Sequence, residues 1–459
     1  MNKFRFYIAL WMAKLALFTM GILKYKGTNF PGQLAIKICP EFLRYIGKPE
    51  RIIGITGTNG KTTVANMVID SLREDGIYPL NNSYGSNIHT GIATALLKDT
   101  GFWGKSKKEM AILEIDERAM PLIMTYVKPE IMAVTNLFRD SMKRNAHTEY
   151  IAGILDKYIP DDAYMILNGD DIISSRLKPD NDRVYFGIES LPTDLDHSIN
   201  LINDARICPE CSHRLSYTNV RYHHIGRCYC SNCGFRSPEP DFLGETPDVD
   251  SKRITISHKG MKYEFPLNNG GIHNMYNTVC VATILYKIGY SLKEAANLMK
   301  NVSVVGSRFS SEKCGQVTVS NQMAKENNAV GSSRAFDYIS SLPGDKELIL
   351  MMNCLGDQEH WSENTCWLYD CDFELLNKDD IKHIIVTGPR GKDYHLRLLM
   401  AGVPEEKITW VEKEIDAPNK LSYTPAESIF IFFGTDSLVL GNKVMEKTKE
   451  IARKKGELQ

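Results

Sequence analysis

A glycine-rich run holds the residues most able to do chemistry. It reads Gly54-Ile55-Thr56-Gly57-Thr58-Asn59-Gly60-Lys61-Thr62-Thr63, between an apolar, strand-like stretch and a helix-like one. Backbone N–H groups at such a strand-to-helix turn point at an anion, and the helix dipole favours its charge. The lysine reaches the β- and γ-phosphates, and the next hydroxyl can ligate Mg²⁺. The run therefore predicts ATP binding by Gly57, Thr58, Asn59, Gly60, Lys61, Thr62 and Thr63.

Four cysteines form a second chemical constellation, two CxxC pairs separated by 18 residues: Cys208, Cys211, Cys230 and Cys233. Each pair forms a short knuckle with two thiolates, and four thiolates satisfy tetrahedral Zn²⁺ in a closed structural site. The spacing predicts a zinc ribbon that folds the insert and takes no part in catalysis. Four reduced, unmetallated thiols are the alternative. Cys228, His213, His223 and His224 are expected to lie outside the ligand set.

Strand-like and helix-like stretches alternate around these motifs, as expected for βαβ units on a mostly parallel sheet. The predicted strands of this first series are 52–56, 110–115, 131–136, 164–168 and 183–187. A β-hairpin is predicted over 253–266, followed by helices over 274–289 and 291–301. A second series has strands at 348–352, 383–387, 408–411 and 429–434, with a helix at 394–401. The fold class is therefore α/β, with a second and smaller α/β domain.

Three regions follow from this pattern. Residues 1–48 are predicted to be a helical segment that packs on the ATPase domain. Residues 49–305 form the ATP-binding domain with the ribbon inserted at about 205–240, and residues 306–459 form the C-terminal domain. The apolar stretch from Phe6 to Leu23 is similar to a signal peptide or membrane span, but Lys14 interrupts it and would be costly in hydrocarbon. We expect a docked helix, with a membrane-surface helix as the alternative.

Composition excludes several classes of function. The chain has 459 residues, of which 43% are hydrophobic and 24% charged, which is typical of soluble globular proteins. A formal net charge of −1 leaves no electrostatic footprint for nucleic acid. Eleven widely spaced cysteines do not form a secreted disulfide framework and indicate a reducing cytoplasm.

With these motifs placed, the chain resembles the MurT family, subunits of lipid II isoglutaminyl synthases within the Mur ligase superfamily. Five residues, not the usual four, separate Gly54 from Gly60-Lys61, a variant found in Mur ligases and folylpolyglutamate synthases. The other matching segments are Gly85–Asn87, Leu113–Glu117, Thr135–Asp140, the ribbon with Cys233-Gly234-Phe235, His273–Asn277 and Trp367–Glu374. A Mur-type ATPase core with a Cys₄ ribbon is similar to this family and unlike the peptide-adding Mur ligases.

The resemblance implies an ATP-dependent amidation in peptidoglycan synthesis. The α-carboxylate of D-glutamate in the lipid II stem peptide would become the amide, through an acyl phosphate, at the inner face of a bacterial cell membrane. None of the eleven cysteines lies in a G-x-C-x-G elbow of a glutaminase, and Cys314 and Cys354 come closest. The resemblance therefore implies a separate GatD-type glutaminase subunit, docked on the C-terminal domain as a heterodimer.

Residue roles follow from the matching motifs. Thr62 and Glu114 would ligate Mg²⁺, Asn274 and Asn277 would contact adenine, and Arg308 would reach the nucleotide from between the domains. Lys61 and Glu114, with a C-terminal aspartate, are the expected catalytic residues; Asn87 and Arg139 are weaker substrate-side candidates. A solvated acid at Glu114, an N-cap with a surface amide at the asparagines and an exposed linker arginine remain the alternatives.

One segment departs from the family pattern. Where the family has A-D-G-x-D-V-S-W, this chain has Leu355-Gly356-Asp357-Gln358-Glu359-His360-Trp361-Ser362-Glu363-Asn364 before Trp367. Asp357 is the candidate for the essential aspartate, but the spacing also fits Asn364, which cannot act as a base. Lys325-Glu326-Asn327 likewise replaces K-N-P. A diverged nucleotide-binding scaffold and a conventional amino-acid ligase of the Mur or folylpolyglutamate type are therefore the alternative functions.

Overall fold

The computed structural model describes residues 2–24, 29–83, 86–139, 147–248, 251–267, 271–302, 309–324, 328–351, 365–423, 426–434 and 437–457. Contacts divide the chain into two compact units. The first comprises Met1–Phe138, His147–Ile199 and Asn203–Val304. The second comprises Arg139–Ala146, Asn200–Ile202 and Val305–Gln459.

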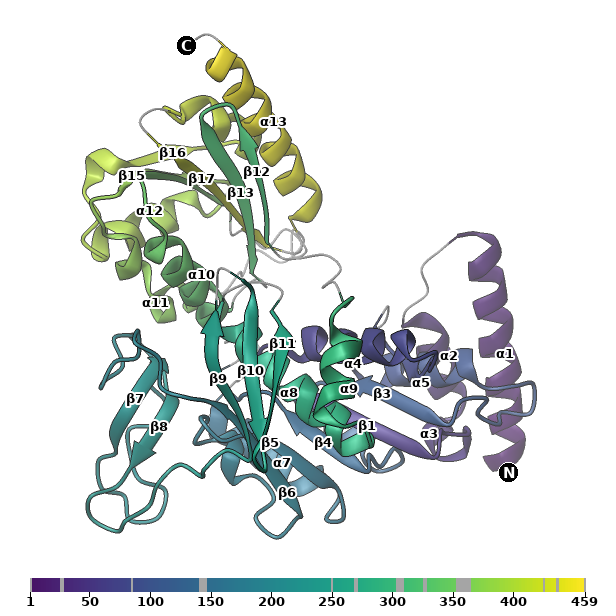
Figure 1. The fold of residues 1–459 in the computed structure, drawn as a ribbon. Helices are drawn as coiled ribbons and strands as arrows, with labels where there is room; N and C mark the ends of the chain where they lie inside the picture. The colour runs from purple at the N-terminus through teal and green to yellow at the C-terminus, as the bar shows by residue number, and fades with distance from the viewer. Residues whose placement is uncertain are drawn as a thin grey trace. The chain divides into compact units, whose positions relative to one another are not determined.

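The first unit is built on a nine-stranded sheet in the order β11-β10-β9-β6-β5-β4-β1-β3-β2 (Figure 1). The strands are β1 (Arg51–Thr56), β2 (Leu80–Asn81), β3 (Met110–Glu114), β4 (Ile131–Val134), β5 (Tyr164–Asn168), β6 (Arg183–Ile188), β9 (Phe242–Asp248), β10 (Arg253–His258) and β11 (Met261–Pro266). Along this order, every pair from β9–β6 through to β3–β2 is parallel. The pairs β9–β10 and β10–β11 are antiparallel.

Helices cover both faces of this sheet. They are α1 (Asn2–Ile22), α2 (Phe30–Ile38), α3 (Phe42–Tyr45), α4 (Lys61–Glu74), α5 (His89–Asp99), α6 (Met120–Ile123), α7 (Thr148–Tyr158), α8 (Ile272–Ile288) and α9 (Leu292–Met299). Local sequence sets several ends: Ser291 and Glu294 form a capping box at the start of α9, and Gly289, with φ 124°, ends α8. Strand β1 is buried from Ile52 onward, as expected for a central parallel strand.

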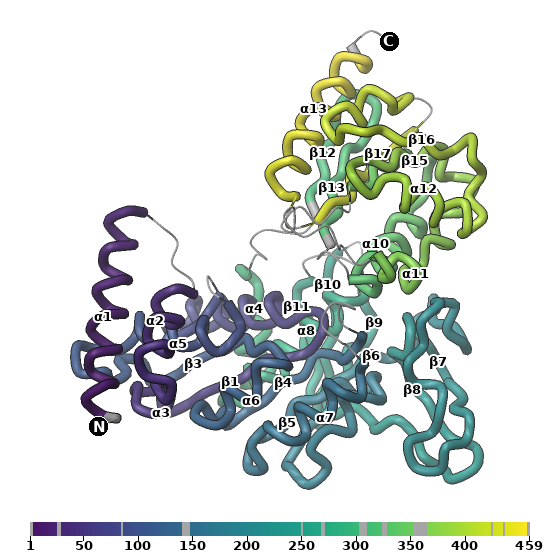
Figure 2. The backbone as a smooth tube through the Cα atoms, turned by 180° about the vertical axis from the view of Figure 1, so that it is seen from behind, coloured from purple at the N-terminus to yellow at the C-terminus, as the bar shows by residue number. Residues whose placement is uncertain are grey.

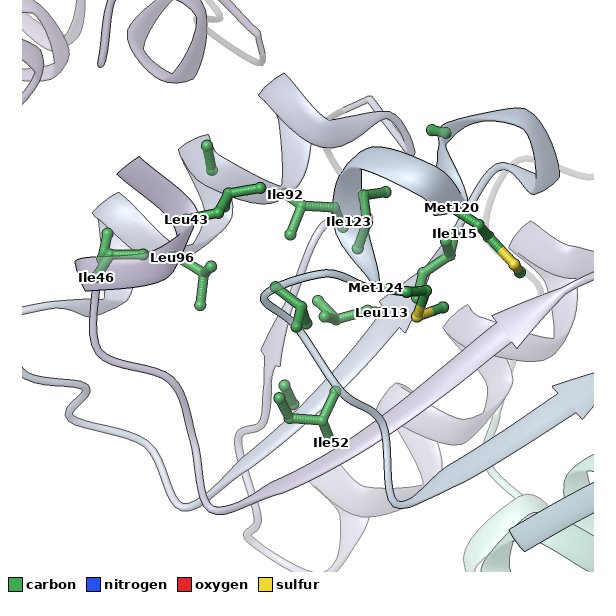
Figure 3. Packing of buried hydrophobic residues seen from close by; sticks show 14 of the residues in the cluster. Leu43, Ile46, Ile52, Ile92, Leu96, Leu113, Ile115, Met120, Ile123 and Met124 are labelled. Atoms are coloured by element: carbon green, nitrogen blue, oxygen red, sulfur yellow. The ribbon is translucent and has the colours of Figure 1, made fainter. Parts of the chain in front are cut away.

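A large apolar core fills one side of the sheet. Figure 3 shows Leu43 of α3 and Ile46, the residue after that helix, beside Ile92 and Leu96 of α5, above Ile52 of β1. The core continues into α1, whose residues Phe6, Ala9, Leu10 and Ala13 are buried in the same cluster. The N-terminal helix is therefore packed against the rest of the first unit along one of its faces.

The cysteine-bearing insert interrupts the chain between β6 and β9. Its hairpin, β7 (Ser216–Tyr222) and β8 (Ile225–Tyr229), forms a separate two-stranded sheet (Figure 2). Strands β6 and β9 are parallel neighbours, and parallel strands need a long crossover connection. Here the insert makes that connection, in the place where a helix usually lies.

The second unit has a six-stranded sheet in the order β12-β13-β17-β14-β15-β16. Its elements are β12 (Phe309–Cys314), β13 (Val317–Ala324), α10 (Ala329–Ser341), β14 (Lys346–Met351), α11 (Trp367–Asp370), β15 (Ile381–Thr387), α12 (Gly391–Met400), β16 (Ile408–Val411), β17 (Ser428–Gly434) and α13 (Leu438–Glu457). Leu348 and Leu350 enter one apolar cluster, while Ile349 and Met351 enter another. Since alternate residues point to opposite faces, both faces are covered.

The predicted α/β fold class is confirmed, and the predicted strands match the observed ones within two residues. The hairpin β12–β13 and helix α10 were not anticipated. The first unit ends at Val304 by its contacts, but residues 303–308 lie outside the described residues. The three-region division therefore stays a prediction.

Candidate functional site

The predicted phosphate loop is a tight turn from β1 into α4. Gly57 has φ 125° and Gly60, the residue before the helix, has φ 89°. Residues with a Cβ rarely adopt these backbone conformations. The surroundings also exclude a Cβ. At Gly57 it would lie 2.2 Å from Thr135 Oγ1, and at Gly60 2.5 Å from Asn277 Oδ1. The glycines thus let two other segments approach the loop closely.

Residues that follow β4 hold the turn in place. The Thr58 N–H donates to the Asn136 carbonyl (2.8 Å), and the Asn59 N–H donates to Asn136 Oδ1 (3.0 Å). In return, Thr135 Oγ1 and Asn136 Nδ2 donate to the Asn59 carbonyl at 2.6 and 3.0 Å. This exchange explains why β4 ends at Val134, two residues before the predicted end. Thr135 and Asn136 leave the strand to support the loop.

Glu117 closes the loop from the opposite side. Its Oε1 accepts hydrogen bonds from the Gly57 N–H and from Lys61 Nζ, both at 2.9 Å. Burial by itself would lower the pKa of Lys61, but the charge and hydrogen bond of Glu117, with the charges of Glu114 and Asp116, outweigh it and raise the pKa. The lysine is therefore a protonated ammonium, and the Glu117 oxygen occupies two donors of the loop, the Gly57 N–H and Lys61 Nζ.

The predicted magnesium ligands lie at neighbouring ends. Thr62 is exposed in the first turn of α4, and Glu114 ends β3, the strand beside β1. Glu114 Oε1 accepts from Asn87 Nδ2 at 3.0 Å, and the Glu114 N–H donates to Asn82 Oδ1 at 2.9 Å. Carboxylate and hydroxyl oxygens suit Mg²⁺. The donor set present at this end of the sheet is thus compatible with the ion.

Asn277 reaches the phosphate loop from far along the chain. It lies in α8, is 7% exposed and faces Gly60. Asn274 lies one turn earlier in the same helix. The structure therefore brings Asn277 to the loop, while Arg308, Asp357 and Asn364 lie outside the described residues, as does Lys325-Glu326-Asn327.

The four cysteines of the insert come together as predicted. Their Sγ atoms all lie within 4.8 Å of one another, with Cys208–Cys233 at 3.6 Å and Cys211–Cys230 at 3.5 Å. A disulfide would need about 2.05 Å. Four Zn–S bonds of about 2.3 Å in a tetrahedron put the sulfurs about 3.8 Å apart. The cluster thus fits a closed metal site.

The two knuckles share one backbone pattern. The Ser212 N–H donates to the Cys208 carbonyl (2.9 Å), and the Gly234 N–H donates to the Cys230 carbonyl (3.0 Å). Ser212 and Gly234 both have positive φ, 59° and 79°. Cys228, as predicted, lies outside the cluster. It is buried beside Ser237, whose Oγ lies 3.5 Å from its sulfur.

The tip of the hairpin is buried rather than solvated. His223 and His224 are fully buried in the turn between β7 and β8, and the ring of His224 lies 4.6 Å from that of Phe138. His224 Nε2 is 3.3 Å from Asp171 Oδ1. Burial would raise the pKa of Asp171, but this pairing and backbone hydrogen bonds from Leu137 and Ile173 lower it.

Asp170, beside this pair, connects the hairpin to α8. Its Oδ2 accepts from Tyr276 Oη (2.7 Å), Arg221 Nη1 (3.2 Å) and the Ile188 N–H (3.0 Å). Tyr276 directly precedes Asn277, and the Arg221 side chain is 2% exposed. Sequence reasoning missed Asp170, Arg221, Tyr276 and Glu117 because their roles depend on partners far away in sequence.

Comparison with known proteins supports the fold. The Mur ligase middle domain model matches residues 55–233, and the MurT ligase C-terminal model matches residues 326–434. Solved structures include a pseudomurein peptide ligase type C from Methanothermus fervidus, 20% identical with a TM-score of 0.66, covering 89% of this chain and 80% of that one. MurF from Acinetobacter baumannii gives 14% identity and a TM-score of 0.64, covering 91% and 80%. These two likenesses concern the fold.

Sequence relatives are more specific. The MurT subunit of lipid II isoglutaminyl synthase from Staphylococcus aureus (strain COL) is 30% identical over 414 residues, covering 90% of this chain and 91% of the relative. The corresponding subunit of Streptococcus pneumoniae (strain R6) is 30% identical, covering 84% of each chain. With its Mur-type phosphate loop and its four-cysteine insert, the chain belongs to the family of MurT subunits of lipid II isoglutaminyl synthases.

Proposed function

We propose that this chain is the ATP-dependent ligase subunit of a lipid II isoglutaminyl synthase. It would convert the α-carboxylate of D-glutamate in the stem peptide to the amide of D-isoglutamine, in peptidoglycan synthesis. The observation that carries the proposal is the anion cradle of Gly57, Lys61 and the α4 N-terminus. It occurs in a chain that aligns with MurT subunits along nine-tenths of its length.

A carboxylate is a poor electrophile, so the chain must activate it before nitrogen can be added. In the proposed reaction, the carboxylate oxygen attacks the γ-phosphorus of ATP and ADP leaves. Ammonia then attacks the carbonyl carbon, loses a proton, and phosphate leaves as the C–N bond forms. Such transfers depend on positioning and on neutralising charge. The Lys61 ammonium and the loop N–H groups are suited to both tasks.

Other residues complete the proposed site. Thr62 and Glu114 would hold Mg²⁺, which would supply positive charge to the phosphates. Asn277 and Asn274 would hold adenine, Arg308 would reach the nucleotide, and Asp357 would be the catalytic aspartate of the C-terminal region. Glu117 accepts hydrogen bonds from Gly57 and Lys61 on one of its oxygens. It would give up both bonds when phosphate binds, because the phosphate would take the same two donors.

The remaining parts of the proposal concern metal, partner and location. Cys208, Cys211, Cys230 and Cys233 would hold a structural Zn²⁺, with no open coordination position for catalysis. The nitrogen would come from a GatD-type glutaminase subunit bound to the C-terminal region. The complex would work in the cytoplasm, at the inner face of the cell membrane, where a lipid-linked substrate is found.

One experiment tests the activity. The purified chain is incubated with a GatD-type subunit, lipid II, MgATP and either glutamine or ammonium, and the stem peptide is analysed by mass spectrometry for conversion of carboxyl to amide. We expect product from both nitrogen sources. Product from ammonium alone would place the fault at the glutaminase interface. No product from either, with ATP still bound, would favour the diverged scaffold, and amino-acid-dependent ATP turnover would favour a conventional ligase.

Three variants sharpen this test. Lys61→Met removes the ammonium from the cradle and should reduce amidation by about 100-fold or more, the scale expected when one preorganised charge contact is lost. Lys128→Met, at an exposed position of the same unit, is the matched control and should leave the rate unchanged. Asp357→Asn then tests whether that residue acts in the amidation step. Equal rates for the Lys61 variant and the wild type would contradict the proposed cradle.

A further inference from the structure

Helix α1 carries a second apolar face that stays largely exposed among the residues that the structure describes. Its side chains Phe4, Trp11, Leu15, Phe18 and Ile22, which we name the apolar stripe, are 72, 40, 63, 67 and 66% exposed. Their spacings of three, four and seven residues place them on one side of an α-helix. A surface helix normally presents polar residues to water, and a contiguous exposed apolar patch marks an interaction site.

The loop after α5 extends this stripe. Phe102 and Trp103 are 62 and 65% exposed. The ring of Phe102 stacks on Trp11 at 5.4 Å and meets Trp103 edge-on at 5.1 Å. The aromatic cluster has an amphipathic member at its edge, since the Trp11 indole N–H donates to the Phe102 carbonyl. Tryptophan is enriched where protein meets the headgroup region of a bilayer.

The opposite side of α1 packs in the core of the first unit. Phe6, Ala9, Leu10 and Ala13 are at most 4% exposed in the core of the first unit, the same core whose α3 and α5 residues appear in Figure 3. Lys14 adds a polar attachment, because its Nζ donates to the carbonyls of Leu97 (3.0 Å) and Thr100 (2.6 Å) at the end of α5. The charge that interrupts the apolar sequence therefore points toward the protein and leaves the stripe uncharged.

These contacts distinguish two membrane arrangements. By length and composition, Lys3–Ile22 could cross a bilayer, with a mean hydropathy of 1.3. Crossing would remove the buried face from its core and Lys14 from its two carbonyls. A helix that lies in the interface plane keeps both and inserts only the stripe. The structure is compatible with the second arrangement and opposes the first.

Charge around the stripe favours an anionic partner. Helix α1 contains no acidic residue, and Lys3, Arg5 and Lys24 are exposed near its ends. Lys105 and Lys107 are exposed just after Trp103. Of the nearby acids, Asp99 accepts from Ser106 Oγ and the Lys107 N–H, Glu41 pairs with Arg44, and Glu109 is exposed. Basic residues near an anionic bilayer add to the binding of an amphipathic helix.

We propose that the apolar stripe, together with Phe102 and Trp103, docks on an anionic lipid bilayer with α1 parallel to the membrane plane. The first unit would remain folded beneath it, attached through the buried face and Lys14. The vesicle binding is independent of the proposed amidation. If the amidation is also correct, docking concentrates the enzyme where a lipid-linked substrate lies.

Vesicle sedimentation of the full chain tests the proposal. We expect the chain to pellet with vesicles of phosphatidylglycerol and phosphatidylcholine, and to bind pure phosphatidylcholine several-fold more weakly. Leu15→Glu combined with Phe18→Glu should weaken binding at least about 10-fold, because charges then replace the centre of the stripe. Leu122→Glu, 54% exposed on α6, is the matched control and should bind like the wild type. Circular dichroism confirms that all variants fold.

Depth measurements separate docking from spanning. Trp11 lies midway along α1, so quenching by lipids brominated at different carbons should be strongest for shallow bromines. Strongest quenching by bromines at the bilayer centre would overturn the parallel arrangement. Absence of binding to anionic vesicles, or a dimer that the double variant dissolves without any vesicle binding, would overturn membrane docking altogether. A soluble muropeptide as substrate checks the amidation separately, since the double variant should turn it over at the wild-type rate.

Discussion

Glu117 occupies donors that the proposed phosphate cradle would need for its anion. It accepts from Gly57 and Lys61 at once, so the cradle is already neutralised before any nucleotide arrives. A buried lysine without that partner would lose part of its charge preference. Glu117 therefore holds the ammonium in place, and in the proposed function it would compete with the nucleotide for the same donors.

This competition gives a prediction at a single residue. In Glu117→Gln the side chain keeps its shape and loses its charge, so it should hold Gly57 and Lys61 more weakly. We expect the affinity for ADP to rise by about 5- to 10-fold, the scale of one ordinary net hydrogen bond. Isothermal titration calorimetry measures it. Asp116→Asn is the control. The wild-type Asp116 carboxylate caps the next turn by accepting a hydrogen bond from the Arg118 N–H. A weaker affinity for ADP would show that Glu117 acts with the nucleotide instead of against it.

At the scale of elements, the ribbon is held by its cysteines at one end and by a buried tip at the other. We predict that the purified chain contains one zinc ion for each four-cysteine cluster, and that the Cys233→Ser variant loses this ion. Cys228→Ser, next to the cluster but outside it, should keep the metal. Elemental analysis with thermal unfolding checks both. Full zinc content in the Cys233 variant would contradict the four-cysteine site.

A second prediction at the scale of secondary-structure elements concerns the sheet of the second unit. Glu347 of β14 accepts from the Ser422 N–H and the Tyr423 N–H, both at 2.9 Å, and lies 3.5 Å from His383 Nδ1. Burial would raise the pKa of Glu347, but the pairing with His383 and these hydrogen bonds lower it below 4.5. Its folded-state pKa is thus depressed, so its stabilisation is present above pH 4.5 and is lost as the pH falls through the lowered pKa.

Glu347→Gln should therefore lower the free energy of unfolding by about 1–3 kcal/mol at neutral pH. It should also weaken the pH dependence on the acid side. Urea unfolding at neutral and acid pH measures both effects. Glu312, whose side chain is 45% exposed and which pairs with Lys449 and Arg453, provides the contrast, because the ion pairs of an exposed carboxylate contribute little. Equal losses in Glu347→Gln and Glu312→Gln would contradict the role of burial.

At the scale of the whole molecule, Asp170 joins parts of the chain that the sequence keeps far apart. It binds Arg221 of the ribbon hairpin and Tyr276 of α8, and the next residue, Asn277, faces Gly60 of the phosphate loop. Loosening the ribbon should therefore weaken binding at the proposed nucleotide site. Such coupling between two sites is a free energy that a double-mutant comparison can measure.

We predict that Cys233→Ser weakens ADP binding several-fold and that Tyr276→Phe reduces this effect, because it removes one contact of the connection. The dissociation constant for ADP is measured in both single variants and in the double variant. Tyr290→Phe, which also removes a hydrogen bond to an aspartate (Asp75, 2.7 Å), is the matched control. Additive effects of Cys233→Ser and Tyr276→Phe would show that the two sites are independent.

Local patterns in the sequence predicted much of this architecture. Glycines, apolar runs and CxxC spacing are short-range signals, so the phosphate loop, the central strands, the hairpin β10–β11 and the cysteine cluster could be anticipated. What could not be anticipated depends on tertiary contacts. Thr135 and Asn136 look like strand residues until their bonds to the loop are known, and His223 and His224 look like loop residues until Phe138 and Asp171 surround them.

The place of the insert in the sheet has a consequence for how the chain folds. Strand β9 can pair with β6 only after residues 189–241 have returned to the sheet edge, and the entropy of closing a loop opposes that return. A metal that fixes the two knuckles shortens the flexible part of this connection. Refolding should therefore be faster with zinc present from the start, because β9, β10 and β11 can join the sheet only after the ribbon has formed. The metal would then set the order in which the sheet is completed.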